Sequence, residues 1–159
     1  MFVHHSFVAV GLSLLAFLGA PTLAFAAGDL FPKGCVSCHT VDKAKGADHR
    51  ISTALAQWTG GKIDADLLAK SKASMPAGVT LKGKHPAAED ALEDIPGACL
   101  DCHDPGSKKA PPFSQLLHLV HLVGGTDNAF VTNFKGDCAH CHKLNAQTGV
   151  WSMPSGAEQ

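Results

Sequence analysis

The stretch Cys35-Val36-Ser37-Cys38-His39 follows the pattern Cys-x-x-Cys-His, and the chain repeats this pattern twice. The second copy is Cys99-Leu-Asp-Cys102-His103, and the third is Cys138-Ala-His-Cys141-His142. All 6 cysteines of the 159-residue chain belong to these copies, and every cysteine pair is followed at once by a histidine. A pattern that recurs and leaves no cysteine over indicates that the three copies perform the same chemistry.

This pattern is the attachment motif of covalently bound haem. Its two thiols add to the vinyl groups on neighbouring pyrroles, and the next histidine reaches the iron as proximal ligand. A zinc ribbon would have its cysteine pairs roughly 15–20 residues apart, closer than here. A disulfide framework would not need the histidines. We therefore expect three covalently bound haem c groups, attached through Cys35, Cys38, Cys99, Cys102, Cys138 and Cys141, with His39, His103 and His142 as proximal ligands.

Two further histidines lie on one predicted helix, residues 113–123, with the sequence Phe-Ser-Gln-Leu-Leu-His-Leu-Val-His-Leu-Val. Ser114 is the expected N-cap, and the glycines at 124 and 125 are the expected end. His118 and His121 are three residues apart and therefore share a helix face. Because each iron has one vacant axial position, we expect these imidazoles to ligate two different haems and to hold them close together.

With three attachment motifs and this histidine pair, the chain resembles the multihaem c-type cytochromes of bacterial respiration, especially the small class III-like periplasmic ones. The resemblance covers nearly the whole chain after the N-terminal segment. It implies covalent haem, little regular structure and electron transfer as the activity. Class III cytochromes use a similarly spaced histidine pair for two neighbouring haems.

The remaining axial ligand has three candidates. His85 lies 14 residues before Cys99, and many multihaem cytochromes carry a distal histidine shortly upstream of an attachment motif. Met75, which precedes a proline, resembles the ligand of monohaem cytochromes, and His49 follows His39 by ten residues. We expect His85 to be the ligand and keep Met75 and His49 open. The choice matters because a methionine ligand would raise the haem potential.

Three other residues have expected surroundings. His140 stands inside the third motif and is expected to point away from that haem, at the surface. Trp58 and Trp151 are expected to pack against haems.

Composition narrows the function further. The chain has 13 Lys and Arg against 14 Asp and Glu, a balance that disfavours nucleic-acid binding. Aromatic residues make up 6%, with no tyrosine, so side chains alone supply little core. We expect the porphyrins to supply much of the apolar interior and the haem-free chain to be largely unfolded.

The N-terminal segment predicts export. Residues 1–28 contain no Asp, Glu, Lys or Arg, residues 8–18 are almost continuously apolar, and Ala24-Phe25-Ala26 is a small-x-small cleavage signal. We expect a signal peptide over residues 1–26, with an uncleaved membrane anchor as the alternative because the segment lacks an N-terminal Lys or Arg. The mature chain is expected to be periplasmic, with an extracellular location as the alternative, and to have no membrane span.

The expected fold is mainly α with extensive coil and no significant β-sheet, organised by its haems. Besides residues 113–123, helices are predicted over 51–58, 63–74 and 86–94. The motif spacing predicts an N-terminal lobe, residues 27–95, with the first haem. It also predicts a C-terminal lobe, residues 96–159, with the second and third haems.

The expected function is electron transfer rather than catalysis, because an iron with two axial ligands has no open position for a substrate. The resemblance implies a membrane quinol-oxidising cytochrome upstream, and a terminal reductase or an outer-surface conduit downstream, as in anaerobic respiration. Two alternatives stay open: a haem-containing reductase with one open coordination site, and a subunit of an extracellular cytochrome filament. The sequence leaves the oligomeric state open.

Overall fold

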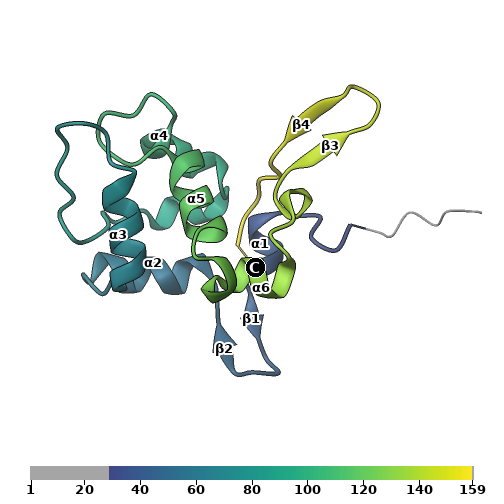
Figure 1. Ribbon diagram of the computed structural model, residues 1–159, viewed down its shortest axis with the longest axis horizontal. Coiled ribbons are helices and arrows are strands. Elements are labelled where there is room, and N and C mark those ends of the chain that lie inside the picture. Colours follow the sequence, from purple (N-terminus) through teal and green to yellow (C-terminus); the bar gives the residue numbers. More distant parts are fainter. Residues whose placement is uncertain (1–28, 159) are drawn as a thin grey trace, which may run out of the picture.

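The computed structural model describes residues 29–158, so the predicted signal peptide over residues 1–26 lies outside the described residues. The described chain is mostly helical with long coil segments, as predicted (Figure 1). Its α-helices are α1 (Cys35–Cys38), α2 (Ile51–Thr59), α3 (Ala65–Ala73), α4 (Leu100–His103), α5 (Phe113–Leu122) and α6 (Ala129–Phe134). Its 3-10 helices are η1 (Glu89–Glu93), η2 (Gly97–Cys99), η3 (Gly125–Asp127) and η4 (Cys138–His140). Its strands are β1 (Val41–Asp42), β2 (Ala47–Asp48), β3 (Lys143–Asn145) and β4 (Val150–Ser152).

Helices α2 and α3 confirm the predictions for 51–58 and 63–74 to within two residues at each end. The Asp64 carboxylate caps α3 by accepting a hydrogen bond from the Leu67 N–H, at 2.9 Å. Asp66 in the first turn and Lys70 in the last turn suit the helix dipole, and they form an ion pair at 2.7 Å. The helix predicted over 86–94 is only the short 3-10 helix η1.

Helix α5 is the element that carries His118 and His121. The prediction of Ser114 as its N-cap is wrong, because Pro112 takes that place and the helix begins at Phe113. A proline fits there because its fixed φ leads into the helix without requiring a backbone N–H. The predicted stop is confirmed: α5 ends at Leu122, and Gly124 adopts a left-handed conformation with φ 119°.

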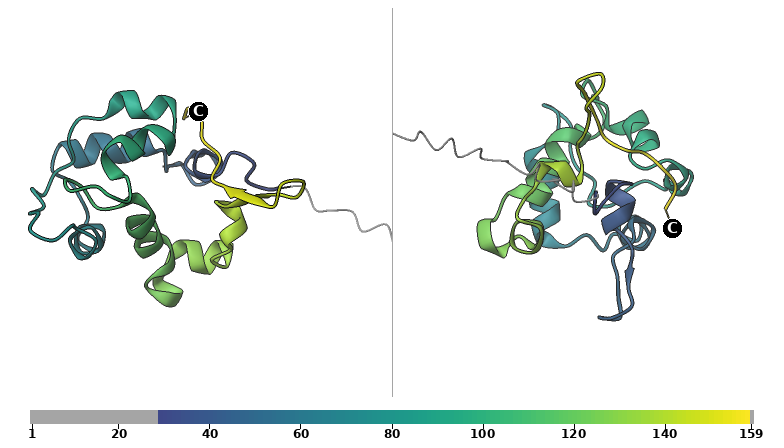
Figure 2. Two further views of the ribbon diagram at one scale, coloured as in Figure 1. Left: turned by 90° about the horizontal axis from the view of Figure 1, so that it is seen from above. Right: turned by 90° about the vertical axis from the view of Figure 1, so that its right-hand side faces the viewer.

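Helix α6, which the sequence analysis did not predict, is tied to the end of α5 by one buried asparagine. The Asn128 side-chain oxygen accepts hydrogen bonds from the N–H groups of Phe130 and Val131, at 3.0 and 3.4 Å. Its amide nitrogen donates to the carbonyls of Val120 and Val123, at 2.8 and 3.0 Å. Asn128 therefore holds α6 at a fixed position relative to α5. Helix α5 packs against α6 on one side and against α3 on the other (Figures 1 and 2).

The two hairpins, β1–β2 and β3–β4, are antiparallel and too short to form a significant sheet, as predicted. Each directly follows an attachment motif and closes in the same way. The Asp42 carboxylate accepts from the N–H groups at 44 and 45, and the Asn145 side chain accepts from those at 147 and 148. Gly46 and Gly149 then take positive φ, 63° and 69°. The segments that follow the first and third motifs are therefore copies of one local structure.

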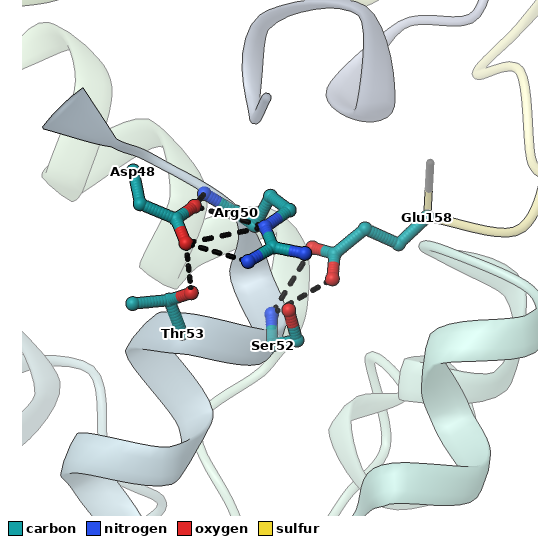
Figure 3. A network of polar contacts seen from close by, with 5 residues as sticks. All are labelled: Asp48, Arg50, Ser52, Thr53 and Glu158. Carbon is teal, nitrogen blue, oxygen red and sulfur yellow. Dashed lines mark hydrogen bonds and ion pairs between the residues drawn. The ribbon is translucent and has the colours of Figure 1, made fainter. Parts of the chain in front are cut away.

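The C-terminal tail forms hydrogen bonds with two distant segments, the one that precedes the second motif and the start of α2. Ile95 and Gly156 exchange two backbone hydrogen bonds, at 2.8 and 3.0 Å. The Glu158 carboxylate accepts from the Ser52 N–H at the start of α2, at 3.0 Å (Figure 3). Beside it, Arg50 pairs with Asp48 at 2.7 Å, and this hydrogen-bonded contact holds the pKa of the Asp48 carboxyl well below its usual range.

The hydrophobic core formed by side chains is very small. Within the described residues, the buried hydrophobic side chains are Val36 and Ile95. Several large apolar side chains are exposed instead, among them Leu144 at 50% and Trp151 at 58%. Across residues 29–158, no helix combines the length and the apolar character that crossing a membrane requires.

Candidate functional site

Each attachment motif forms a tight helical turn. The first lies on α1, the second on η2 and α4, and the third on η4. The backbone N–H of His39 donates to the Cys35 carbonyl at 2.9 Å, and that of His142 donates to the Cys138 carbonyl at 2.8 Å. Residues three and four positions apart in a helical turn share a face, so the two cysteines of a motif and its histidine are placed on one side of the turn. All six cysteines are free thiols.

Cys35, Cys38, Cys99 and Cys141 differ from the thiols of disulfide oxidoreductases in their pKa. Burial raises the pKa of the Cys35 thiol to about 11, and the nearby Cys141 thiol contributes to the shift. Burial also raises the pKa of Cys38, Cys99 and Cys141. Redox-active cysteine pairs have lowered pKa values, because the thiolate is the reacting form. The raised pKa values of these four thiols therefore do not fit a redox-active cysteine pair.

The histidines that follow the cysteines each face a second histidine from a distant part of the chain. His39 faces His121, with ring centres 6.2 Å apart and ring planes at 86°. His103 faces His85 at 6.0 Å and 7°. His142 faces His118 at 6.2 Å and 42°. We call these the first, second and third histidine pairs, after the motif that supplies one histidine of each.

The spacing within the pairs fits one metal ion between two imidazoles. Imidazoles on opposite sides of one ion, each bound through a nitrogen about 2 Å away, have ring centres about 6 Å apart. A haem iron takes its other ligands from the porphyrin, so a pair of this kind would suffice to complete the coordination of one. Among residues 29–158, no group of three or more His, Cys, Asp and Glu side chains is arranged to hold a metal ion without a porphyrin.

Hydrogen bonds leave Nε2 available for a metal in four of the six imidazoles. In each case Nδ1 lies within hydrogen-bond distance of a backbone carbonyl: His39 with His49 at 2.9 Å, His85 with Pro86 at 2.7 Å, His103 with Pro111 at 2.7 Å and His121 with Leu117 at 3.0 Å. A metal-bound histidine commonly donates its other ring N–H in this way, and the contact fixes both tautomer and ring orientation. Through its backbone carbonyl, His49 thus helps to orient the His39 ring.

Burial keeps the central imidazoles in the form that binds a metal. It lowers the pKa of His103, although the contact with Pro111 opposes this, and the neighbouring His85 lowers it further. Burial likewise lowers the pKa of His121, with His39 adding to the shift. A lowered pKa keeps an imidazole neutral, and the neutral imidazole is the metal ligand.

Helix α5 meets all three histidine pairs. Its first residue, Phe113, packs edge-to-face against His103 at 5.9 Å. His118 belongs to the third pair and His121 to the first. The helix therefore joins the first and third pairs directly and contacts the second. All three pairs join residues far apart in the sequence, and the first and second cross the predicted boundary between residues 95 and 96.

The structure places His85, rather than Met75 or His49, opposite His103. Trp58 lies beside the same pair, with its ring 6.3 Å from His85, and its carbonyl accepts from the His85 N–H at 3.1 Å.

Trp151 and His142 line one pocket of about 340 Å³. A second pocket of about 600 Å³ is lined in part by His121 and Phe130. Open volume thus lies beside a histidine of the first and of the third pair.

The expectation that His140 lies free at the surface is wrong. Its ring packs against Phe31 at 4.5 Å and against Phe130 and Phe134 at 6.1 Å each. These four residues form an aromatic cluster that sequence analysis missed, since Phe31 lies about 100 residues before the two phenylalanines of α6, Phe130 and Phe134. His140 is half-buried there because the third motif turns it toward α6.

No known family model, curated protein or solved structure matches this chain.

Proposed function

We propose that the protein is a trihaem c-type cytochrome that transfers electrons between respiratory redox partners. The proposal assigns one covalently attached haem to each cysteine motif and one histidine pair to each iron. In this assignment His121 serves the haem of Cys35 and Cys38, His85 serves that of Cys99 and Cys102, and His118 serves that of Cys138 and Cys141. When bound, each haem would take up and release one electron at its iron.

The observation that carries this proposal is the threefold coincidence of motif and spacing. Each of the three motif histidines has a second imidazole at 6.0–6.2 Å. The partners come from a loop before the second motif and from two positions on α5, so local sequence does not produce the spacing. The small side-chain core adds support, because porphyrins would cover the exposed apolar residues.

Full axial ligation favours electron transfer over catalysis. A reductase needs an iron with an open position, whereas here every motif histidine has an imidazole opposite it. Two histidine ligands also keep a haem potential lower than a histidine and a methionine do. The proposed protein is therefore a low-potential carrier with three similar centres.

All six proposed axial ligands belong to one chain. A cytochrome filament in which one subunit ligates a haem of the next would need a histidine from a neighbouring copy, and no iron in this assignment lacks a ligand. The proposal therefore favours a self-contained carrier over a filament subunit. Its proposed location is periplasmic, on the basis of the N-terminal sequence. Its proposed partners are a membrane quinol-oxidising cytochrome and a terminal reductase or outer-surface conduit.

Carbon monoxide binding tests full ligation, because this gas needs an open position on ferrous haem. The reduced holoprotein is expected not to bind carbon monoxide rapidly. His85→Ala is expected to create one binding haem per chain, measured by optical difference spectroscopy. His49→Ala is the matched control and is expected to behave like the unchanged protein, because its carbonyl contact with His39 is retained. Rapid binding by the unchanged protein would favour the reductase instead.

A further inference from the structure

The first histidine pair differs from the second in the angle between its rings. The planes of His39 and His121 stand at 86°, whereas those of His85 and His103 stand at 7°. An axial imidazole interacts through its π system with the iron d orbital perpendicular to its own plane. Parallel rings raise the same d orbital and separate it from its partner, whereas perpendicular rings raise both orbitals nearly equally. The two haems should therefore differ in electronic ground state although both have two histidine ligands.

Two contacts orient the His121 ring. Its Nδ1 lies 3.0 Å from the Leu117 carbonyl, one turn earlier on α5. The Phe130 ring also packs edge-to-face against it, with ring centres 5.5 Å apart and planes at 82°. Edge-to-face packing of aromatic rings is favourable and depends on the angle between them. The phenylalanine therefore resists rotation of the imidazole.

Phe130 is itself held on both sides. Asn128 caps the helix that carries it and bonds to two carbonyls at the end of α5, the helix of His121. Phe130 also belongs to the aromatic cluster, where its ring centre lies 5.9 Å from that of Phe134 and 6.1 Å from that of His140. The position of the Phe130 ring relative to His121 is thus fixed by backbone contacts and by packing.

We propose that Phe130 is a positioning residue that holds the His121 ring perpendicular to His39 and so sets the electronic ground state and the potential of the first haem. This inference rests on the proposed function. It concerns one haem of the three. The aromatic cluster behind Phe130 includes His140 of the third motif, so the contact also couples the first ligand pair to the third attachment turn.

Electron paramagnetic resonance of the ferric holoprotein tests the proposal. The unchanged protein is expected to give one highly anisotropic low-spin signal from the first haem and a rhombic signal from the second. Phe130→Leu removes the edge-to-face contact and keeps an apolar side chain. It is expected to shift the anisotropic signal toward the rhombic type, to move the potential of one haem in a redox titration, and to leave the rhombic signal in place. Phe130→Tyr keeps the ring and is expected to keep the anisotropic signal.

Phe134→Leu is the matched control, because Phe134 belongs to the same cluster and its ring packs on Phe31, Phe130 and His140. It is expected to leave both signals unchanged. An anisotropic signal that stays in place in Phe130→Leu would overturn the inference, since the Leu117 contact alone would then orient the ring. An equal shift in Phe134→Leu would also overturn it. If the unchanged protein gave no low-spin signals of haem with two histidine ligands, the proposed function itself would fail.

Discussion

The haem-free chain is expected to be largely unfolded. Folding costs backbone and side-chain entropy that apolar burial must offset, and the buried hydrophobic side chains of residues 29–158 are only Val36 and Ile95. Helices α2 and α3 are nine residues each and α5 is ten, and isolated helices shorter than about 12–15 residues are marginal in water. Without porphyrins, little remains to hold these elements together.

The measurement is circular dichroism on residues 27–159 produced in a cytoplasm without haem-attachment enzymes, beside the holoprotein. The haem-free chain is expected to lose most of its helical signal and to show no cooperative thermal transition. The holoprotein serves as the control and is expected to melt cooperatively. A haem-free chain with native helix content and a cooperative transition would show that side chains alone form the fold.

Replacing the two histidines of α5 by methionine is expected to raise the potentials of two different haems. Methionine with histidine raises a haem potential relative to two histidines, and axial ligands move potentials over a range of about 0.8 V. His121→Met should raise the potential of one haem by on the order of 0.1 V or more. It should also remove the anisotropic paramagnetic-resonance signal of the first pair. His118→Met should raise another centre by a similar amount and leave the signal of the first pair in place.

A spectroelectrochemical titration of each variant measures these shifts, and paramagnetic resonance identifies the affected haem. His49→Met is the control, because the structure uses the carbonyl of that residue and gives its imidazole no place in a histidine pair. The double variant should show two raised centres. If both single variants altered the same haem, the pairing of His121 with His39 and of His118 with His142 would be wrong.

The parts of the structure that local sequence determines could be predicted. The helical ends at Asp64 and Gly124 depend on capping groups within a few residues. The largely helical, coil-rich character was also predicted, from the individual helix segments and from the resemblance to multihaem cytochromes. Local sequence did not determine which residue lies opposite each motif histidine. His85, His49 and Met75 all stayed candidates for one position, because proximity in three dimensions depends on how distant segments pack.

The missed elements have identifiable causes. Helix α6 has six residues, and its cap Asn128 follows a glycine turn, so no long apolar repeat marked it. The hairpins have strands of two or three residues, too short for alternation to show. A signal for them was nevertheless present, because Asp42 and Gly46 stand at the same distances after His39 as Asn145 and Gly149 do after His142. Comparing the segments that follow the motifs would have predicted the repeat.

The expected division at residue 95 remains a prediction, and the histidine pairs bear on it. His39 and His85 belong to the first expected lobe, but their partners, His121 and His103, belong to the second. If haem ligation follows these pairs, two of the three haems bridge the lobes, and the haems join the chain into one unit.

Near-infrared magnetic circular dichroism of the purified ferric holoprotein distinguishes the proposed ligation from its alternatives, because two-histidine and histidine–methionine haems give distinct bands there. We expect only the two-histidine band, with an intensity per chain that corresponds to three haems. A histidine–methionine band, or an intensity that corresponds to fewer than three two-histidine haems, would contradict it.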